Sequence, residues 1–164
     1  MRRWADRHGF QPDPGSVLLV REPDRVARTD VRIRPMAATD HDAVVALHEA
    51  AFPGTHTTGP ALVVADDPRL VIEIDGAVAG YVAYEVQSDN TGYIDFLAVD
   101  PAVRSHGLGG ALVDHACVDL FGRGVRHAHL TVREANAAAR ALYARLGFVE
   151  ERVVRPYRRG FTLP

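Results

Sequence analysis

Apolar and polar positions alternate along this chain in a pattern that predicts short strands and amphipathic helices in succession. Val44, Leu47 and Ala51 recur at helical spacing, and the polar run over residues 39–42 matches a capping box. This combination predicts a first helix over residues 40–51.

A hairpin is the clearest feature of the next part of the chain. Residues 70–74 read as a strand, Asp75-Gly76 as a tight turn and residues 77–86 as the returning strand, and residues 93–99 add another strand. Residues 55–68 show no clear periodicity, so we expect a loop or a short broken helix there.

The second half of the chain continues the alternation of helices and strands. Apolar spacing predicts a helix from Leu108 to about residue 122 or 124 and a strand over residues 127–132. Asn136 can cap a last helix that Gly147 ends. Two closing strands are expected over residues 148–154 and 157–163. The order of elements predicts an α/β fold with a mixed sheet around a central parallel pair that a helix connects.

Composition limits the class of protein. A chain of 164 residues with 47% hydrophobic content can bury a core as one domain without metals or disulfides, and its single cysteine, Cys117, fits a packed thiol in a reducing cytoplasm. No stretch approaches the roughly 20 apolar residues of a membrane span, so we expect a soluble protein without a membrane partner. The net charge of -2 makes nucleic acid an unexpected partner. The pairs His41/His48 and His127/His129 bring no third ligand, so we expect no metal site.

A glycine-rich turn carries the first chemical signal. It consists of Arg104, Ser105, His106, Gly107, Leu108, Gly109 and Gly110. Glycines at the start of a helix let backbone N–H groups approach an anion that the helix dipole also favours, and a pyrophosphate is the natural guest. A dinucleotide-binding motif would need glycine or alanine in place of Leu112, and a P-loop would need Gly-Lys-Ser/Thr. The alternative is a turn that only begins a helix.

From Ile33 to the C terminus the chain resembles the GNAT superfamily of acetyl-CoA-dependent N-acetyltransferases. The cofactor signature matches at residues 104–109, after the strand over residues 93–99, and a second motif matches at residues 136–148. The resemblance implies the GNAT (acyl-CoA N-acyltransferase) fold, with a splayed parallel strand pair flanked by helices. It also implies acetyl-CoA as cosubstrate and direct transfer of acetyl to a primary amine of a small molecule or peptide. A catalytically idle acyl-CoA-binding regulatory domain is the alternative.

The same resemblance assigns roles to individual residues. It implies that the backbone of Leu97, Ala98 and Val99 lies along the cofactor, with Leu97 at the acetyl carbonyl and Val99 at the pantetheine. Tyr143 occupies the position of the tyrosine that protonates the departing thiolate; a helix-face aromatic packed in the core is the other reading. Asn136 is either a helix cap alone or a cap that also contacts the cofactor.

The general base is open between two carboxylates. Asp95 shares a predicted strand face with Tyr93 and Leu97, and Glu85 lies on the neighbouring hairpin strand, so either could take a proton from the acceptor amine through water. Each could equally be a solvated strand carboxylate.

The acceptor itself is not identified by these patterns. Enzymes of this superfamily that acetylate ribosomal proteins have a glutamate where this chain has Thr131, and histone acetyltransferases have a base glutamate where it has Tyr93. The acceptor pocket is expected from residues 52–69 and 152–160.

The first 29 residues precede the recognisable motifs, and we expect an N-terminal extension over residues 1–29 and the N-acetyltransferase domain over residues 30–164. Residues 4–10 can be laid on residues 142–148, since both end in Gly-Phe. The extension is therefore either the tail of a preceding GNAT repeat or a chance similarity. Its apolar run, residues 17–20, would aggregate if exposed, so we expect it to pair with this domain's sheet or across a homodimer interface.

Overall fold

The computed structural model describes residues 10–12, 15–23, 30, 32–104, 106–155 and 157–159. Its contacts divide them into two compact units, a larger one within residues 21–129 and a smaller one within residues 1–20 and 130–164. The larger unit contains β3 (Ile33–Pro35), α2 (His41–Ala51), α3 (Gly59–Val64), β4 (Arg69–Ile74), β5 (Ala77–Val86), β6 (Gly92–Val99) and α4 (Leu108–Gly122). The smaller unit contains β1 (Phe10–Pro12), α5 (Ala137–Arg145), β8 (Val149–Val154) and β9 (Tyr157–Arg159). Strands β2 (Ser16–Arg21) and β7 (Ala128–Arg133) cross the boundary between the units.

An antiparallel sheet forms the centre of the larger unit. Its strands lie in the order β3, β4, β5, β6, and each neighbouring pair is antiparallel. The β4–β5 hairpin turns at Asp75 and Gly76, whose φ angles of 51° and 79° are left-handed, which confirms the predicted turn. Gly80 is required by close approach, because an added Cβ would lie 2.8 Å from the carbonyl oxygen of Ala98 on β6.

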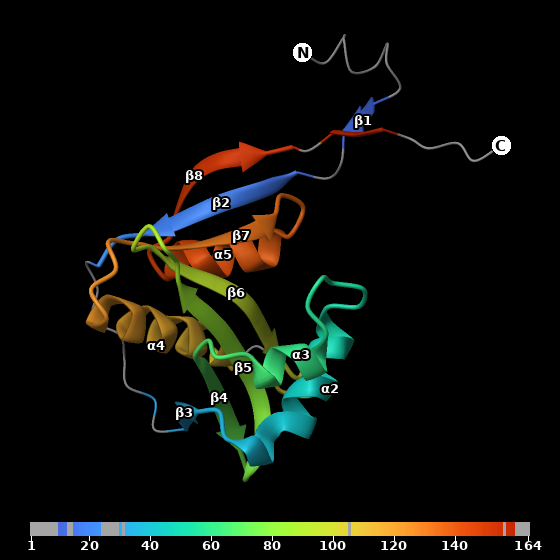
Figure 1. The fold of residues 1–164 in the computed structure, drawn as a ribbon, viewed down its shortest axis with the longest axis vertical. Helices are drawn as coiled ribbons and strands as arrows, with labels where there is room; N and C mark the ends of the chain where they lie inside the picture. Colours follow the sequence, from blue (N-terminus) through green and yellow to red (C-terminus); the bar gives the residue numbers. More distant parts are fainter. Residues whose placement is uncertain are drawn as a thin grey trace, which may run out of the picture. The chain divides into compact units, whose positions relative to one another are not determined.

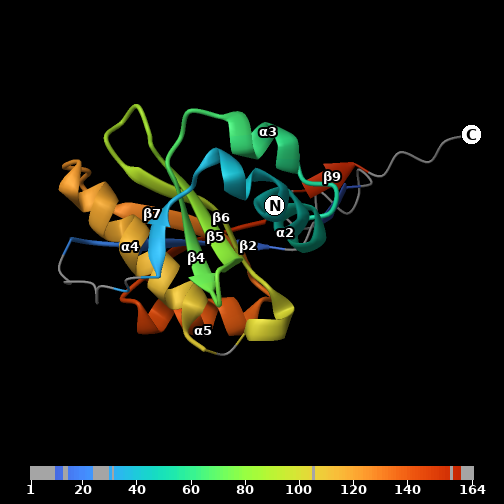
Figure 2. The same cartoon turned by 90° about the horizontal axis from the view of Figure 1, so that it is seen from below.

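Helices cover both faces of this sheet, α2 and α3 on one and α4 on the other (Figures 1 and 2). Val44 and Leu62 from the helices pack on Tyr81 and Phe96 of the strands in one core. On the opposite face, the hydroxyl of Tyr84 donates to a carboxylate oxygen of Asp119 on α4 at 3.0 Å. Strands β5 and β6 therefore lie between two helical layers.

Strands β6 and β7 begin side by side within the larger unit. The N–H of Gly92 donates to the carbonyl oxygen of His127 at 2.9 Å, and one step further the rings of Tyr93 and His129 lie 5.1 Å apart. Both strands therefore advance in the same direction, with α4 as the connecting helix. This is the predicted parallel pair, and the mixed α/β fold is confirmed.

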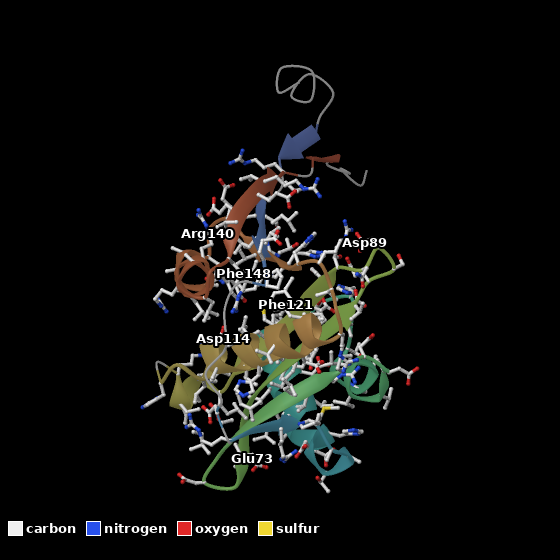
Figure 3. All side chains as sticks on the ribbon, turned by 90° about the vertical axis from the view of Figure 1, so that its left-hand side faces the viewer. Glu73, Asp89, Asp114, Phe121, Arg140 and Phe148 are labelled. Carbon is white, nitrogen blue, oxygen red and sulfur yellow. The ribbon has the colours of Figure 1, made fainter. Side chains whose placement is uncertain are left out.

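The start of the first helix differs from the prediction. A 3-10 turn over Ala38–Asp40 precedes α2, and the Asp40 side chain accepts from the N–H of Ala37 at 2.7 Å. The same carboxylate holds Arg34 through two hydrogen bonds of 2.6 and 2.9 Å, and the Arg34 guanidinium also contacts Glu73, which is labelled in Figure 3. The capping box predicted at residues 39–42 is wrong, because Thr39 lies inside the 3-10 turn and the N-cap of α2 is Asp40, whose side chain does not cap the helix.

In the smaller unit, β2 pairs with β8 in antiparallel register. Val17 and Leu19 are buried, so the prediction that this apolar run is ordered and paired is confirmed. A separate ribbon joins β1 to β9. Residues 4–9, on which the suggested repeat depends, and residues 160–163 of the last predicted strand lie outside the described residues.

Helix α5 begins and ends as its sequence predicts. The Asn136 side chain accepts from the N–H of Ala139 at 3.1 Å, and Gly147 has a φ of 87° just after the helix. The Arg140 side chain joins α5 to Glu150 of β8 (Figure 3). Within the part of the chain that the structure describes, no helix is long and apolar enough to cross a membrane.

Candidate active site

The N terminus of α4 presents backbone N–H groups without helical partners. Gly107 is the N-cap, with a left-handed φ of 76°, and the first helical bond runs from the N–H of Ala111 to its carbonyl oxygen. The N–H groups of Leu108, Gly109 and Gly110 therefore have no partner one turn back, and no described side chain caps this end. Such an end, in a helix of 15 residues, favours an anion.

The loop before α4 is fixed to the end of β6. The Arg104 side chain donates from Nε to the carbonyl oxygen of Val99 at 3.2 Å. The His106 ring lies within hydrogen-bonding distance of the carbonyl oxygens of Val103 and Arg104, at 3.1 and 3.0 Å. The predicted loop residue Ser105 lies outside the described residues. These hydrogen bonds connect the end of β6, through Arg104, with the loop residue His106 just before α4.

A bulge in β6 changes the predicted face of Asp95. Ala83 of β5 pairs with Phe96, but the next residue, Tyr84, pairs with Ile94, so Asp95 is the extra residue. The bulge breaks the alternation along β6, and Tyr93 and Leu97 no longer share a face. The prediction that Asp95 shares a face with both residues is therefore wrong, because it assumed an unbroken strand.

The bulge brings Asp95 into one cavity with Glu85. The cavity has a volume of about 140 Å³. The predicted acceptor region contributes Thr57, Leu62, Ala65, Asp67 and Arg69 to its wall, and Ala83, Tyr84, Glu85 and Asp95 complete it. Both candidate bases thus face the same space as the segment that was expected to shape the acceptor pocket. The other predicted pocket segment, residues 152–160, belongs to the smaller unit.

Burial raises the pKa of Asp95 above the ordinary value of an aspartate. The nearby charges act in both directions: His56 and His48 lower the pKa, whereas Glu85 and Asp67 raise it. The side chain still reaches solvent. An accessible carboxylate with a raised pKa is a stronger base than an ordinary aspartate and suits proton removal from an amine.

A buried histidine fixes the loop at the edge of this cavity. His48 of α2 is fully buried, its Nε2 lies 2.9 Å from the carbonyl oxygen of Thr57, and its Nδ1 lies 2.6 Å from the hydroxyl of Tyr81. A carbonyl can only accept, so Nε2 carries the proton and Nδ1 accepts from the tyrosine. Glu49, one residue further along α2, accepts from the N–H of Gly59 at 2.6 Å. Together these bonds tie the loop and α3 to α2 and β5.

Arg69 lines the same cavity, although it belongs to neither of the two sequence motifs. This residue is only 8% exposed, and its Nη1 donates to the carbonyl oxygen of Ala65 at 2.8 Å. Its Nε is buried, and no described atom lies within hydrogen-bonding distance of it. An arginine between Asp66-Asp67-Pro68 and an apolar strand was the available signal in the sequence.

A larger cavity of about 560 Å³ lies between β3, the start of β4 and the second half of α4. Its Arg34 is held by Asp40 and Glu73, and its Arg123 pairs with Asp119 at 2.7 Å. These charges are already neutralised, and neither candidate base lines this cavity. Both candidate bases line the smaller cavity instead.

Tyr143 and Asn136 lie in the smaller unit. The Tyr143 ring packs against Phe148, with ring centres 5.8 Å apart and an angle of 64° between their planes. Burial raises the pKa of Tyr143 to about 12, so its hydroxyl keeps its proton at physiological pH and can donate it. Asn136 acts as the helix cap, and contact with a cofactor stays a prediction.

No metal chemistry is suggested by the residues that the structure describes. Among them, no three histidine, cysteine, aspartate or glutamate side chains lie close enough together to hold a metal ion. Cys117 is fully buried in α4, and burial raises the pKa of its thiol to about 12. A thiol that stays protonated is a poor nucleophile, in keeping with the predicted packing role.

The comparison with known protein families decides what this arrangement belongs to. A family model described as the acetyltransferase (GNAT) family matches residues 41–148. The chain belongs to the GNAT family. The match includes the glycine turn, the bulged strand, both candidate bases and the whole of the second motif.

Individual relatives show how far the likeness extends. The chain is 35% identical over 133 residues to a mycothiol acetyltransferase of Beutenbergia cavernae, covering 71% of this chain and 44% of that protein. It is 41% identical over 83 residues to the ribosomal protein bS18-alanine N-acetyltransferase of Escherichia coli K12, covering 51% of this chain and 55% of that protein. It therefore spans about half the length of these curated relatives.

The GNAT fold is also found among solved structures. A GCN5-related N-acetyltransferase from Sphaerobacter thermophilus superposes with a TM-score of 0.73 at 21% identity, covering 99% of this chain and 57% of that chain. The predicted fold class is thereby confirmed.

Proposed function

We propose that this GNAT protein is an N-acetyltransferase that moves acetyl from acetyl-CoA to a primary amine by direct attack. The observation that carries the proposal is the shared cavity of Asp95 and Glu85, on the strand whose end leads into the glycine turn of α4. An anion site that follows the strand bearing a candidate base is what transfer from a pyrophosphate-bearing thioester requires.

The cofactor would be held mainly by backbone groups. The free N–H groups at the start of α4 suit the pyrophosphate, and residues 97–99 suit the pantetheine arm as an added strand would. An N–H of Leu97 directed at the acetyl carbonyl would stabilise the tetrahedral oxyanion, a contribution of up to about 3 kcal/mol for one donor.

Separate residues take a proton from the acceptor amine and give a proton to the departing thiolate. Asp95, with Glu85 as the alternative, takes a proton from the acceptor ammonium through water, and the neutral nitrogen attacks the acetyl carbon. Attack forms an N–C bond and a tetrahedral intermediate. The C–S bond then breaks as the carbonyl re-forms, and the nitrogen releases its second proton to solvent. Tyr143 gives its proton to the departing thiolate and regains one from solvent. No covalent enzyme intermediate is needed.

The names of the relatives and two residues of this chain bear on the class of acceptor. The two curated relatives are named as acetyltransferases of mycothiol and of the alanine of ribosomal protein bS18. Thr131 and Tyr93 stand where protein-acetylating members have glutamates, which argues against a ribosomal or histone acceptor and favours a small molecule. We place the reaction in the reducing cytoplasm.

The test is acetyl-CoA turnover with a panel of small amines and peptides, read as release of free thiol. Thiol release that depends on an amine supports transfer. Acetyl-CoA binding without release for any amine would instead support an idle acyl-CoA-binding domain, and failure to bind acetyl-CoA would remove both functions.

A further inference from the structure

We call the smaller cavity, which Asp95, Glu85 and Arg69 line, the acceptor cavity. The guanidinium of Arg69 carries a charge there that is buried but incompletely paired. The residue is 8% exposed, and its single hydrogen bond to the described residues goes to a neutral carbonyl, that of Ala65. Its Nε has no partner. Burial also lowers the pKa of Arg69, as expected where desolvation outweighs the pull of nearby anions.

The nearest acidic residues do not complete the pairing. Asp66 and Asp67 act on Arg69 through their charge, but neither forms an ion pair with it. A buried cation without a hydrogen-bonded anion is unfavourable, and a bound anion would relieve it. Arg34 and Arg123 differ in this respect, because each already contacts a carboxylate.

The rest of the cavity lining carries negative charge. Asp67, Glu85 and Asp95 line the cavity together with Arg69, so negative and positive groups share one small space. The volume of about 140 Å³ equals the share of roughly five water molecules in the liquid, at about 30 Å³ each. This volume suits a small ligand, and the charged lining suits an amine with one further polar group.

Resting on the proposed function, we propose that the acceptor is a small amino acid, with its ammonium group at Asp95 and Glu85 and its carboxylate at Arg69. Arginine suits this role because its planar fork of N–H donors matches a carboxylate. Arg69 is then a specificity-determining residue that contacts the acceptor and takes no part in proton transfer.

The test compares the standard amino acids with their amides as acceptors, with L-alanine and L-alaninamide as the first matched pair. Wild-type protein should acetylate at least one amino acid with a kcat/KM about 10-fold to 100-fold above that of its amide. Arg69→Gln should lower kcat/KM for that amino acid by a similar factor, mainly through KM, and leave the amide unchanged. Arg69→Lys should restore part of the preference.

Two controls separate recognition from folding. Arg123→Gln makes the same chemical change outside the acceptor cavity and should keep the preference, and the acetyl-CoA affinity of Arg69→Gln should equal that of wild type. Equal rates for amino acid and amide in wild type would overturn the proposal, as would an equal loss for both in Arg69→Gln. If other amines are acetylated but no amino acid is, this inference fails and the proposed function stands. If no amine at all is acetylated, the proposed function itself fails.

Discussion

Asp95 owes its chemical character to its surroundings. Burial raises its pKa, and the neighbouring carboxylates of Glu85 and Asp67 add to that effect. For a carboxyl group with a raised pKa in the folded state, the folded protein holds its proton more tightly than the unfolded chain does. The resulting destabilisation is absent below the unfolded pKa, near 3.9, and grows as pH rises through the folded pKa.

Asp95→Asn should therefore lower turnover and raise stability together. Loss of the base should reduce kcat by about 10²-fold, and the acid limb of the kcat/KM profile assigned to this carboxyl should disappear. The midpoint of thermal unfolding should rise at pH 7, and the gain should vanish near pH 3. Glu85→Gln is the matched variant. A large loss of turnover in Glu85→Gln with none in Asp95→Asn would make Glu85 the base.

Burial keeps the Tyr143 hydroxyl protonated, as its proposed role as proton donor requires. With its pKa raised to about 12, the phenol stays protonated over the usual assay range, so it should cause no alkaline loss of activity below about pH 11.

Tyr143→Phe should lower kcat by about 10²-fold or somewhat less, because only the hydroxyl is removed while the ring contact with Phe148 can persist. The checks are steady-state kinetics and acetyl-CoA affinity by calorimetry, which should hardly change. Wild-type turnover, measured where chemistry limits the rate, would reduce Tyr143 to a packing residue.

Among the elements, α4 combines an N-terminal end without a side-chain cap and a buried body. Its first turn offers free N–H groups, while Leu112, Val113 and Leu120 further along are fully buried. The two ends can therefore be changed separately.

Gly109→Val should weaken acetyl-CoA binding by about tenfold or more, since a branched side chain in the first turn obstructs close approach of a phosphate. Calorimetric titration with acetyl-CoA and far-UV circular dichroism would measure affinity and folding. Gly122→Ala at the other end is the control: an added Cβ meets no atom within 4 Å, so binding should persist and stability should rise by about 0.5–1 kcal/mol. Unchanged affinity in Gly109→Val would remove the cofactor assignment.

Three elements meet at His48, which joins α2 to β5 and to the loop before α3. Tyr81→Phe should leave the buried Nδ1 of His48 without a donor and lower the free energy of unfolding by about 1–3 kcal/mol. Chemical denaturation would measure this loss. Tyr84→Phe should lose less, because Asp119 keeps its bond to Arg123. Equal losses in the two variants would argue against the assigned histidine tautomer.

At the scale of the whole molecule, the N-terminal strand matters beyond its sequence motif. Val17 and Leu19 of β2 are buried, and Arg21 at its end bonds to Asp114 of α4 at 2.7 Å. The descent of residues 1–21 from a preceding GNAT repeat stays a hypothesis, but the strand's place in the core does not depend on it.

Deletion of residues 1–21 should lower solubility and the midpoint of thermal unfolding, because it removes buried side chains and leaves β8 without this partner. Acetyl-CoA binding at the start of α4 should persist in the folded fraction. Light scattering and size-exclusion chromatography, with wild type as reference, would show the change. Deletion without effect on solubility, assembly or stability would contradict a structural role for β2.

The sequence by itself determined most of the secondary structure and the family. The β4–β5 hairpin, α4 and α5 follow from local signals, since turn residues, apolar spacing and a cap act over a few neighbouring positions. The glycine turn could likewise be predicted from the sequence, because its backbone geometry depends on which residues lack a side chain.

Only the tertiary structure decided the character of the acceptor cavity. The bulge at Asp95 arises from the register between β5 and β6, and Asp40 forms an ion pair with Arg34. The unpaired charge of Arg69 depends on how deeply β4 is buried. Strand register, burial and long-range ion pairs are set by residues far apart in the chain, so no local pattern could reveal them.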